Sequence, residues 1–554
     1  MQTTHIHGVY EASWESDVAH TNPLWECDTF AEFTGPSGQQ LTVRAFWDEG
    51  ATWRLRFSPN ATGTWTWAAQ TADRAPVAEG TFACVPYTGD NPLYLHGPLQ
   101  LAANRRFLEH ADGTPFFWLA DTAWNGVIRG DDANWHRFLT VRSEQRFTVT
   151  QFVCSHWRGD AVDEMGEPSC TEEHPISVNP AFFQRLDRRV AMINGHGLLA
   201  APVALWSLLE TDIGYKLPEE DAIRLASYIV ARYDAYQVAW LLGGDGNYQK
   251  MGVERWKRIG REVFVTGHDR LVTLHPCGIN WVGEEFRSEE WYDIIGYQSG
   301  HGDGENDLRW LTQGPPATQW QGNPQLPVIN LEPNYEAAKG YRHKTVFTDY
   351  HVRRAAYWSL LVSPTAGLTY GHDSIWNWNF EIGPSEGHGD WHDRAVPPWH
   401  TGLDTPGIHS MTMLRSIIER LPWTRIEPAP EILAEQPGNV DPTAFIAAAR
   451  AGDELLVIYT PCGGAVRLVD DAPIPHNCRR VDPRTGEETL LEIGPANTFA
   501  LPVGEDSLLA VVYCGCRKRD LQPSLIQVER STRRCIALLW HRSTRRCSVQ
   551  PSSI

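Results

Sequence analysis

The stretch LPVINLEPNYE, residues 326–336, is an apolar run that ends on an acidic side chain, Glu332. A second stretch of the same design, VAWLLGGDGNY at 238–248, carries Asp245 where its apolar part ends. Short runs rich in Val, Ile and Leu, without polar alternation, are typical of strands buried on both faces of a parallel sheet. A (β/α)8 barrel presents side chains from the carboxyl ends of such strands at one face. These two stretches therefore indicate an α/β fold built on a parallel barrel.

Strands alternate with amphipathic helices from residue 96 to about residue 426, the pattern of βαβ units. The helical stretches repeat apolar residues at i, i+3 and i+4 and begin with residues that favour helix entry. Eight strands are predicted, which fits a (β/α)8 TIM barrel. The predicted strands span 116–124, 147–157, 197–206, 238–248, 270–278, 292–300, 326–336 and 367–378, and the predicted helices span 134–145, 179–196, 218–233, 253–264 and 348–364.

Two regions of β texture flank the predicted barrel. Residues 1–95 alternate short strand patterns with turn clusters and predict an N-terminal β-sandwich domain, and residues 427–516 predict a C-terminal β-sandwich domain. The proline-punctuated stretch 427–431 is expected to act as a linker. The tail 517–554 is basic, contains RSTRRC twice and is expected to be disordered.

Composition excludes several classes of function. The formal net charge of -20 argues against a nucleic-acid surface, which would be basic. No run of 18 apolar residues is present, so no membrane span or membrane partner is expected. The N-terminus lacks the regions of a signal peptide, which favours a cytoplasmic protein, although a sequence trimmed at its start would look the same. The 11 Cys are scattered without CxxC pairs, a pattern of free thiols in a reducing compartment.

The 24 Trp are numerous, and aromatic faces are common platforms for the apolar faces of sugars. In the N-terminal region we interpret Trp47, Trp53, Trp65 and Trp67 mainly as core of the sandwich and of its contact with the barrel. A sugar platform is the alternative for these four.

Candidate site residues follow the predicted strands. Because the carboxyl ends of barrel strands meet at the catalytic mouth, side chains far apart in sequence would converge there. The candidates include no Lys or Arg, which suits a neutral polyhydroxylated ligand better than a phosphorylated one. They are Asp121, Trp124, His156, Trp157, Trp206, Asp245, Asn247, His275, Tyr297, Gln298, Glu332, His372 and Trp376.

Glycoside hydrolysis needs a carboxylic acid to protonate the leaving oxygen and a carboxylate that faces the anomeric carbon. The fourth and seventh strands lie on opposite sides of a barrel mouth, so Asp245 and Glu332 could flank a scissile bond. A separation of about 5–5.5 Å between the carboxyl groups would make the enzyme retaining, and about 6.5–9.5 Å inverting. Tyr297 and His275 are expected to hold Glu332 by hydrogen bonds and so favour its ionised form.

Each carboxylate has a structural alternative. Asp245, in GGDGN, could be a turn residue, because Asp and Asn between glycines favour tight turns. Glu332, before Pro333, could cap the following turn, and Asp121 could be a helix N-cap instead of a sugar ligand. The paired placement of Asp245 and Glu332 after apolar strands favours catalysis over these readings.

Four motifs in this order carry a family resemblance: HADGTPFFWLADTAW (110–124), AWLLGGDGN (239–247), INLEPNYE (329–336) and AGLTYGHDSIWNW (366–378). Together they resemble the apiosidase-like catalytic domain of glycoside hydrolase family 140. The resemblance covers roughly residues 8–515, because the flanking regions resemble the small β-sandwich and the collagen-binding-type β-sandwich that often accompany this domain.

The resemblance implies a (β/α)8 barrel and a retaining hydrolase, with Asp245 as acid/base and Glu332 as nucleophile. Apiosidases of this family act on branched side chains of pectin and are usually exported, whereas this sequence shows no export signal. A cytoplasmic enzyme that finishes imported pectin oligosaccharides would reconcile the two; finding the native protein in the periplasm or medium would contradict it.

The sequence is also compatible with two rival functions. A metal-dependent barrel hydrolase needs several His and a carboxylate at strand ends. The segment HGDWHD at 388–393 could bind a cation, although we favour a polar loop there and expect neither a metal nor another cofactor. A carbohydrate-binding protein without catalysis would lack a carboxylate on the fourth or seventh strand, and both are present. The substrate expected is therefore a glycoside or oligosaccharide; the sequence does not indicate an oligomeric state.

Overall fold

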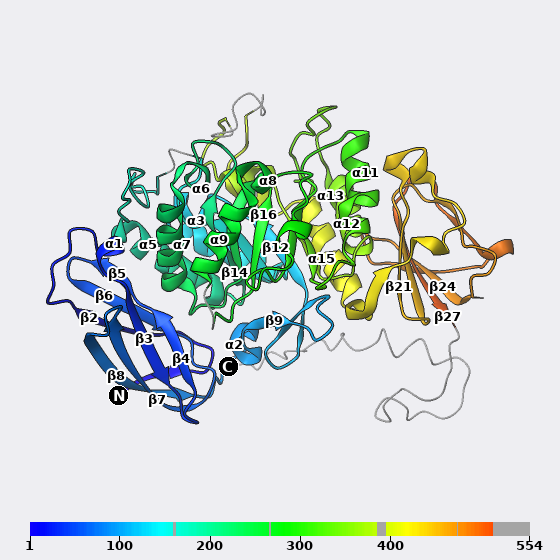
Figure 1. Cartoon of the computed structure of the whole chain (residues 1–554). Coiled ribbons are helices and arrows are strands. Elements are labelled where there is room, and N and C mark those ends of the chain that lie inside the picture. Colours follow the sequence, from blue (N-terminus) through cyan, green and yellow to red (C-terminus); the bar gives the residue numbers. More distant parts are fainter. Residues whose placement is uncertain (159–161, 265–267, 385–394, 474, 514–554) are drawn as a thin grey trace, which may run out of the picture.

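The structure, a computed structural model, describes residues 1–158, 162–264, 268–384, 395–473 and 475–513. A mixed α/β barrel occupies the middle of the molecule (Figure 1). Separate sheets built from the N-terminal and the C-terminal parts of the chain lie on either side of it. The predicted tail, 517–554, lies outside the described residues.

The barrel contains the eight strands that the sequence predicted, all parallel to their neighbours. Their order is β16-β15-β14-β13-β12-β19-β18-β17. One further parallel bridge, between Thr273 and Ile294, joins the two end strands and closes the barrel. The strands are β12 (Trp118–Thr122), β13 (Val149–Val153), β14 (Leu199–Trp206), β15 (Trp240–Gly246), β16 (Val272–Pro276), β17 (Ile295–Gln298), β18 (Val328–Glu332) and β19 (Gly367–Tyr370).

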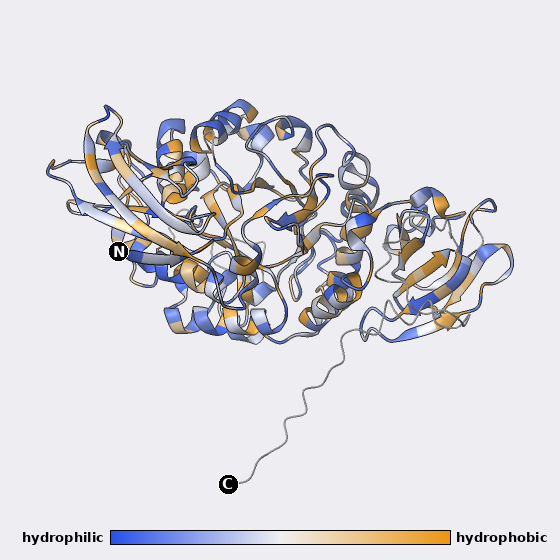
Figure 2. Ribbon diagram, turned by 90° about the horizontal axis from the view of Figure 1, so that it is seen from below, coloured by the Kyte–Doolittle hydropathy of each residue, from blue (hydrophilic) through white to orange (hydrophobic). Residues whose placement is uncertain are grey.

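The barrel strands are buried over almost their whole length, which explains their lack of polar alternation. Figure 2 shows apolar segments on these strands and hydrophilic segments on the surrounding helices. The predicted helices are also present, and each returns the chain to the start of the next strand. They are α4 (Asp132–Glu144), α5 (Pro180–Gly195), α7 (Glu219–Tyr233), α9 (Val253–Val263) and α13 (Asp349–Leu361).

Further elements complete the barrel. A small antiparallel sheet, β11-β10-β9, precedes the first barrel strand. Short helices follow several strands, and α6 and α8 mark the carboxyl end of the barrel at the top of Figure 1. These elements are β9 (Leu99–Leu101), β10 (Leu108–His110), β11 (Pro115–Phe116), α2 (Pro92–His96), α3 (Gly126–Arg129), α6 (Ile213–Lys216), α8 (Tyr248–Met251), α10 (Gly283–Phe286), α11 (Glu305–Gln313), α12 (Pro315–Thr318), α14 (Asp373–Asn377) and α15 (Pro406–Ile418).

The N-terminal part forms two sheets, β1-β8-β7-β3-β4 and β2-β6-β5, around one apolar core. Trp53, Trp65 and Trp67 are buried in this core, and the half-buried Trp47 packs against it, which confirms their interpretation as core residues. The elements are β1 (Gln2–His5), β2 (Tyr10–Glu15), α1 (Pro23–Glu26), β3 (Thr29–Thr34), β4 (Gln40–Arg44), β5 (Phe46–Glu49), β6 (Thr52–Phe57), β7 (Gly63–Thr71) and β8 (Pro76–Val85).

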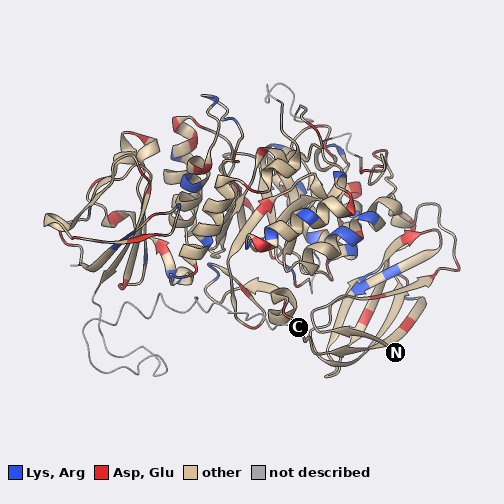
Figure 3. Cartoon of the chain, turned by 180° about the vertical axis from the view of Figure 1, so that it is seen from behind, with Lys and Arg blue, Asp and Glu red and all other residues tan. Residues whose placement is uncertain are grey.

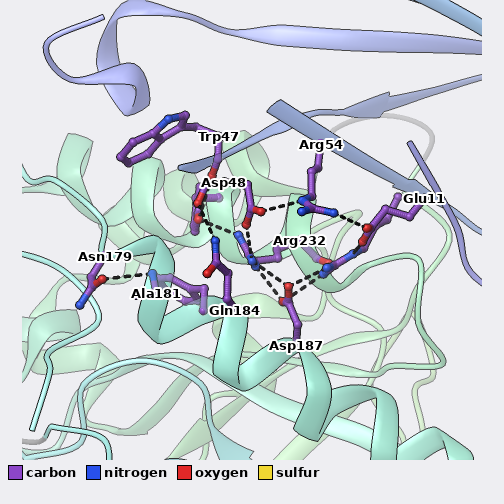
Figure 4. Close-up of polar contacts among 12 residues, drawn as sticks. Glu11, Trp47, Asp48, Arg54, Asn179, Ala181, Gln184, Asp187 and Arg232 are labelled. Atoms are coloured by element: carbon purple, nitrogen blue, oxygen red, sulfur yellow. Dashed lines mark hydrogen bonds and ion pairs between the residues drawn. The ribbon is translucent and has the colours of Figure 1, made fainter. Parts of the chain in front are cut away.

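A cluster of charged side chains joins the N-terminal sheets to the outside of the barrel (Figure 4). Arg56 on β6 pairs with Asp187 on α5 at 2.6 Å, and Arg232 on α7 pairs with Asp187 at 2.7 Å and with Asp48 on β5 at 2.6 Å. All four side chains are largely removed from solvent. Elsewhere, acidic and basic residues are interspersed on the helices around the barrel (Figure 3). We call Asp48, Arg56, Asp187 and Arg232 the interface cluster.

The C-terminal part contains a six-stranded sheet, β20-β21-β22-β27-β24-β25, and a two-stranded sheet, β23-β26. The prediction of a linker at 427–431 is wrong for its first residues, because β20 pairs with β21 as an edge strand, where proline is tolerated. The strands are β20 (Ile426–Pro428), β21 (Ala447–Ala451), β22 (Leu455–Thr460), β23 (Gly464–Arg467), β24 (Pro475–Val481), β25 (Glu488–Leu491), β26 (Thr498–Leu501) and β27 (Ser507–Tyr513). Among the described helices, none is both long and apolar enough to cross a bilayer.

Candidate active site

A cavity of about 780 Å³ opens at the carboxyl ends of the barrel strands. Asp245 and Glu332 both line it, together with residues from the loops that follow the other strands. Two smaller cavities, of about 30 and 210 Å³, lie where the N-terminal sheets meet the barrel and contain neither carboxylate. The cavity at the strand ends is therefore the candidate active site.

Asp245 lies near the end of β15, with its backbone in the left-handed region at a φ of 55°. Asp tolerates this conformation better than most residues, so the turn reading of GGDGN is compatible with a role in the cavity. Burial, and then the negative charge of Glu332, raise the pKa of Asp245 to about 7, while His275 and Arg158 oppose the rise. The side chain is thus a carboxylic acid that exchanges its proton near neutral pH.

Glu332, the last residue of β18, is surrounded by nitrogen donors although only 5% of the residue is exposed. Its Oε1 accepts hydrogen bonds from Gln298 Nε2 at 2.7 Å and His301 Nε2 at 3.0 Å, and its Oε2 lies 3.4 Å from His275 Nε2. Burial by itself would raise the pKa of Glu332, but the imidazoles of His275 and His301 outweigh it and hold the pKa below the usual range. Glu332 is therefore ionised where Asp245 is protonated.

Backbone amides fix the tautomers of both imidazoles. The N–H of Asp245 donates to His275 Nδ1 at 3.4 Å, and the N–H of Tyr335 donates to His301 Nδ1 at 3.3 Å. Because Nδ1 accepts in each ring, the proton of the neutral imidazole is on Nε2, the nitrogen that faces Glu332. His275 thus contacts the backbone of one carboxylate residue and the side chain of the other.

Aromatic side chains form another part of the cavity wall. Trp124, Trp206 and Trp376, all candidates from the sequence, line the cavity, as does Gln298. Trp124 packs edge-on against His275 at 5.0 Å between ring centroids and lies 5.3 Å from Trp206. Trp157 is buried behind them, in contact with Trp206 and Trp376.

Asp121 does not line the cavity, which corrects its assignment as a substrate ligand. Its carboxylate pairs with Arg142 of α4, and neither side chain is exposed to solvent. Arg142 also donates to the backbone oxygens of Gly402 and Leu403, so the pair links the first strand to the chain that follows the last one. Burial raises the pKa of Asp121 more than the neighbouring Arg142 lowers it, so the pairing offsets only part of the cost of burying this carboxyl group.

Six other candidates also lie outside the cavity lining: two of them, His275 and Trp157, are the side chains described above that contact lining residues from behind. Tyr297 is fully buried against Trp281 and Trp310 and makes no hydrogen bond to Glu332, so that expectation is wrong. The strand bulge between Tyr297 and Gln298 places Gln298 opposite Glu332 in its stead. The remaining three are buried or cap short helices: His156 near Cys170, Asn247 at the start of α8, and His372 at the start of α14.

The structure adds residues that the sequence reasoning missed. Arg158, a residue type absent from the predicted set, lines the cavity with its guanidinium over the ring of Trp157 at 4.6 Å. Most additions lie within three residues of a predicted position, whereas Asp307 and Tyr341 lie nine residues beyond Gln298 and Glu332 and carried no such signal. The added lining residues with polar side chains are Arg158, Ser299, His301, Asp307, Tyr335, Tyr341 and Asp373.

Within the described part of the chain, no group of three or more His, Cys, Asp or Glu side chains is arranged to hold a metal ion. The segment 388–393, the predicted alternative cation site, lies outside the described residues.

Comparison with known proteins agrees with the barrel fold. Residues 102–425 match the sequence model of the apiosidase-like catalytic domain, and residues 3–72 match a domain of unknown function, DUF5060. A solved structure titled glycoside hydrolase is similar with a TM-score of 0.65 and 23% identity over 77% of this chain and 99% of its own. A glycoside hydrolase family 5 structure from Bacteroides vulgatus has a TM-score of 0.64 and 20% identity over 80% of this chain and 98% of its own. A comparison with curated proteins finds no match.

The barrel, its cavity and the family match define a glycosidase of the (β/α)8-barrel class. More specifically, the chain belongs to the apiosidase-like catalytic domain family, whose model covers more than half of it. At the identities given, the two solved structures show the shared fold alone.

Proposed function

We propose that this glycosidase cleaves a glycosidic bond in a plant-type, apiosidase-like oligosaccharide by a retaining mechanism. Asp245 is the acid/base and Glu332 the nucleophile. The observation that carries the assignment is the opposite displacement of two carboxyl pKa values in one cavity: raised to about 7 for Asp245 and lowered for Glu332. In glycoside hydrolysis, the carboxyl group with the raised pKa acts as the acid, and the one with the lowered pKa acts as the nucleophile. The family match supports the proposal.

In the first step Glu332 attacks the anomeric carbon while Asp245 donates its proton to the leaving oxygen. Oε1 of Glu332 already accepts from Gln298 and His301, so Oε2 is the oxygen that bonds to the sugar. The carbon–oxygen bond to the leaving group breaks, and a covalent glycosyl ester forms. In the second step Asp245, now a carboxylate, takes a proton from water, which attacks the ester and releases Glu332.

The pKa of Asp245 suits both of its roles, because a group with a pKa near the working pH can donate and then accept a proton. Once the ester has formed, the negative charge of Glu332 is gone, and with it one of the causes that raise the pKa of Asp245. The pKa then falls, so Asp245 remains ionised until water arrives. The loss of the negative charge of Glu332 therefore changes Asp245 from the acid of the first step to the base of the second.

The rest of the cavity suits a hydroxylated ring. The three indoles offer flat apolar faces to the C–H faces of a sugar. Gln298 Oε1 and Trp206 Nε1 are buried on the cavity wall without a hydrogen-bond partner in the described protein. Sugar hydroxyls can donate to the first and accept from the second.

We also propose that residues 96–426 form the catalytic domain, between sandwiches 1–95 and 427–516. The match at 102–425 supports this division.

The test is hydrolysis of a panel of aryl glycosides and pectin-derived oligosaccharides, including apiosides, with azide as an external nucleophile. Asp245→Ala with azide is expected to give a glycosyl azide of retained configuration, because Glu332 still forms the ester. Glu332→Gly with azide is expected to give the inverted glycosyl azide, because azide replaces the nucleophile. Each variant is the control for the other, and the same product configuration from both would refute the assignment of roles.

A further inference from the structure

The part of the cavity around Asp245 differs in polarity from the part around Glu332. Strands β14 and β16 are the two neighbours of β15, so the loops after them flank Asp245. Apart from Asp245, the lining side chains from this part are apolar or weakly polar. They are Trp206, Leu208, Leu209, Cys277, Gly278 and Ile279. By contrast, the ends of β17 and β18 and the segments that follow them provide Gln298, Ser299, His301, Asp307, Glu332, Tyr335 and Tyr341.

Leu209, in the loop after β14, presents its side chain outwards: 41% of the residue is exposed at the cavity. The local backbone holds this orientation. The N–H of Leu209 donates to Asp212 Oδ2 at 2.6 Å, and the N–H of Asp212 donates back to the carbonyl of Leu209 at 2.9 Å. Asp212 is itself buried, so these two hydrogen bonds tie the loop to the protein interior.

Ile279, in the loop after β16, is exposed by 47% and has a φ of 51°. The N–H of Asn280 donates to the carbonyl of Cys277 at 3.2 Å, which makes Ile279 the third residue of a turn. A left-handed backbone at this position ordinarily requires Gly or Asn, and a β-branched residue there is strained. The N–H of Ile279 donates to the carbonyl of Gln298 at 2.9 Å, so the strained residue is anchored to the end of β17, whose Gln298 side chain donates to Glu332.

Strain of this kind, and exposed apolar side chains beside a cavity, both point to ligand contact. The acid that protonates the leaving oxygen must touch the leaving group. If Asp245 is that acid, the leaving group lies between the two loops. An apolar leaving group with a flat face would bury Leu209 and Ile279 and lie against the indole of Trp206.

We propose that the loops after β14 and β16 form an aglycone site that selects substrates with an aromatic leaving group. The inference rests on the proposed function, in which Asp245 is the acid. It refines that function by specifying the leaving group. The enzyme is expected to cleave a glycoside with an aryl or arylalkyl leaving group faster than a glycoside whose leaving group is another sugar. The polar part of the cavity, around Glu332, then receives the sugar that is transferred.

The competing occupant of this part of the cavity is a carboxylated sugar, because Arg158 also lines the cavity. Arg158 follows β13, one strand further from Asp245 than the two loops, and its guanidinium stacks over Trp157 at 4.6 Å and Trp376 at 5.7 Å. Leu209 and Ile279 are nearer neighbours of β15 in the sheet order, and they favour the apolar occupant.

The test compares benzyl and methyl glycosides of one sugar that the enzyme cleaves. The two leaving alcohols have similar acidity, so the ratio of their kcat/KM values reports contact with the ring instead of bond reactivity. We expect the wild-type enzyme to favour the benzyl glycoside at least tenfold. A ratio near one, or faster cleavage of a glycoside whose leaving group is a uronic acid, would overturn the proposal.

Two variants assign the preference to these residues. Ile279→Asn removes the apolar side chain and relieves the left-handed backbone, so it is expected to fold at least as well as the wild type. In Ile279→Asn and in Leu209→Ser the benzyl-to-methyl ratio is expected to fall about fivefold or more. Val503→Ser, a matched control at an apolar residue exposed by 85% in the C-terminal part, leaves the ratio unchanged. An unchanged ratio in both loop variants would contradict the proposal.

Binding of the aglycone alone separates this inference from the proposed function. Saturation-transfer NMR with benzyl alcohol is expected to give a signal with wild type that is lost in the Leu209→Ser/Ile279→Asn double variant. An equal signal in both proteins would refute the aglycone site even if glycosides are cleaved. If no glycoside is cleaved but the signal depends on these residues, the hydrolase assignment fails and the apolar site stands.

Discussion

The active site and the interface cluster both remove carboxylates from water, but with opposite results. Asp187 in the interface cluster faces Arg56 and Arg232, and although burial would raise its pKa, the two guanidinium groups lower it to about 2. Asp245 faces the negative charge of Glu332, and its pKa rises to about 7. Burial acts in the same direction on both carboxylates. The charges that accompany it decide whether a buried carboxylate is a structural ion or an acid.

The two regions also differ in the groups that surround their buried carboxylates. In the interface cluster, two Arg face two Asp and every carboxylate oxygen concerned has a close cationic partner. In the active site, the contacts of the Glu332 carboxylate come from two imidazoles and one amide instead of from guanidinium groups. The candidate nucleophile is therefore held by imidazole and amide donors, whereas the attachment of the N-terminal part uses guanidinium–carboxylate pairs.

The largest effect is expected from Asp245→Asn. Asn keeps the shape and tolerates the left-handed backbone, but it has no proton to donate. We expect kcat/KM to fall by about 10²–10⁴-fold, the usual contribution of a general acid. Steady-state kinetics on a substrate with a poor leaving group gives the value. Retention of full activity would remove Asp245 from the mechanism.

Asp187→Ala should instead reduce stability, because it leaves Arg56 and Arg232 buried without their shared partner. We expect the free energy of unfolding to fall by about 3–5 kcal/mol, with little change in kcat. Denaturant unfolding measures it. Asp470→Ala is the matched control, since it removes a carboxylate from an exposed pair with Arg467 and should change stability by less than about 1 kcal/mol. Equal effects of the two substitutions would contradict the role given to the interface cluster.

The pH dependence of stability should separate the two carboxylates. The pKa of Asp187 lies below its ordinary value of 3.8, so its contribution, about 2 kcal/mol, is present above pH 4 and lost as the pH falls towards 2. The raised pKa of Asp245 acts oppositely: between about pH 4 and 7 the unfolded chain releases a proton that the folded protein keeps, so stability decreases as pH rises.

Unfolding measurements at several pH values check both signs. The stability gap between wild type and Asp187→Ala should narrow below pH 4. Asp245→Asn should be more stable than wild type at pH 7 and equal to it near pH 4. An advantage of Asp245→Asn that grows on acidification would show that its pKa is not raised.

The smallest effect is expected on the alkaline limb of the pH–rate profile. The positive charge of Arg158 lowers the pKa of Asp245, so Arg158→Met should move the limb, near pH 7 in wild type, upwards by about one unit or less. The kcat/KM profile of a cleaved glycoside records the shift. Arg137→Met is the control, because Arg137 also stacks on an indole, that of Trp399, but belongs to the outer helix α4. A downward shift in Arg158→Met would contradict the electrostatic reading.

Much of the fold was predictable from local patterns. Apolar runs gave all eight barrel strands, and 3.6-residue periodicity gave the helices between them, because both signals depend only on neighbouring residues. The candidate carboxylates Asp245 and Glu332 were found for the same reason, since each ends an apolar run. The linker at 427–431 was mistaken because proline at a sheet edge looks like proline in a loop.

The sequence by itself thus determined the barrel and the two carboxylates that its strands deliver to the cavity. It could not determine which way the other strand-end side chains face. Asp121 turns to Arg142 and Tyr297 into the core, whereas His301 and Arg158 face the cavity. A shift of one position along a strand, or one bulge, exchanges the two faces. Only the tertiary structure brought His275 and His301 to Glu332, because hydrogen bonds between different strands depend on register and closure, which no local pattern encodes.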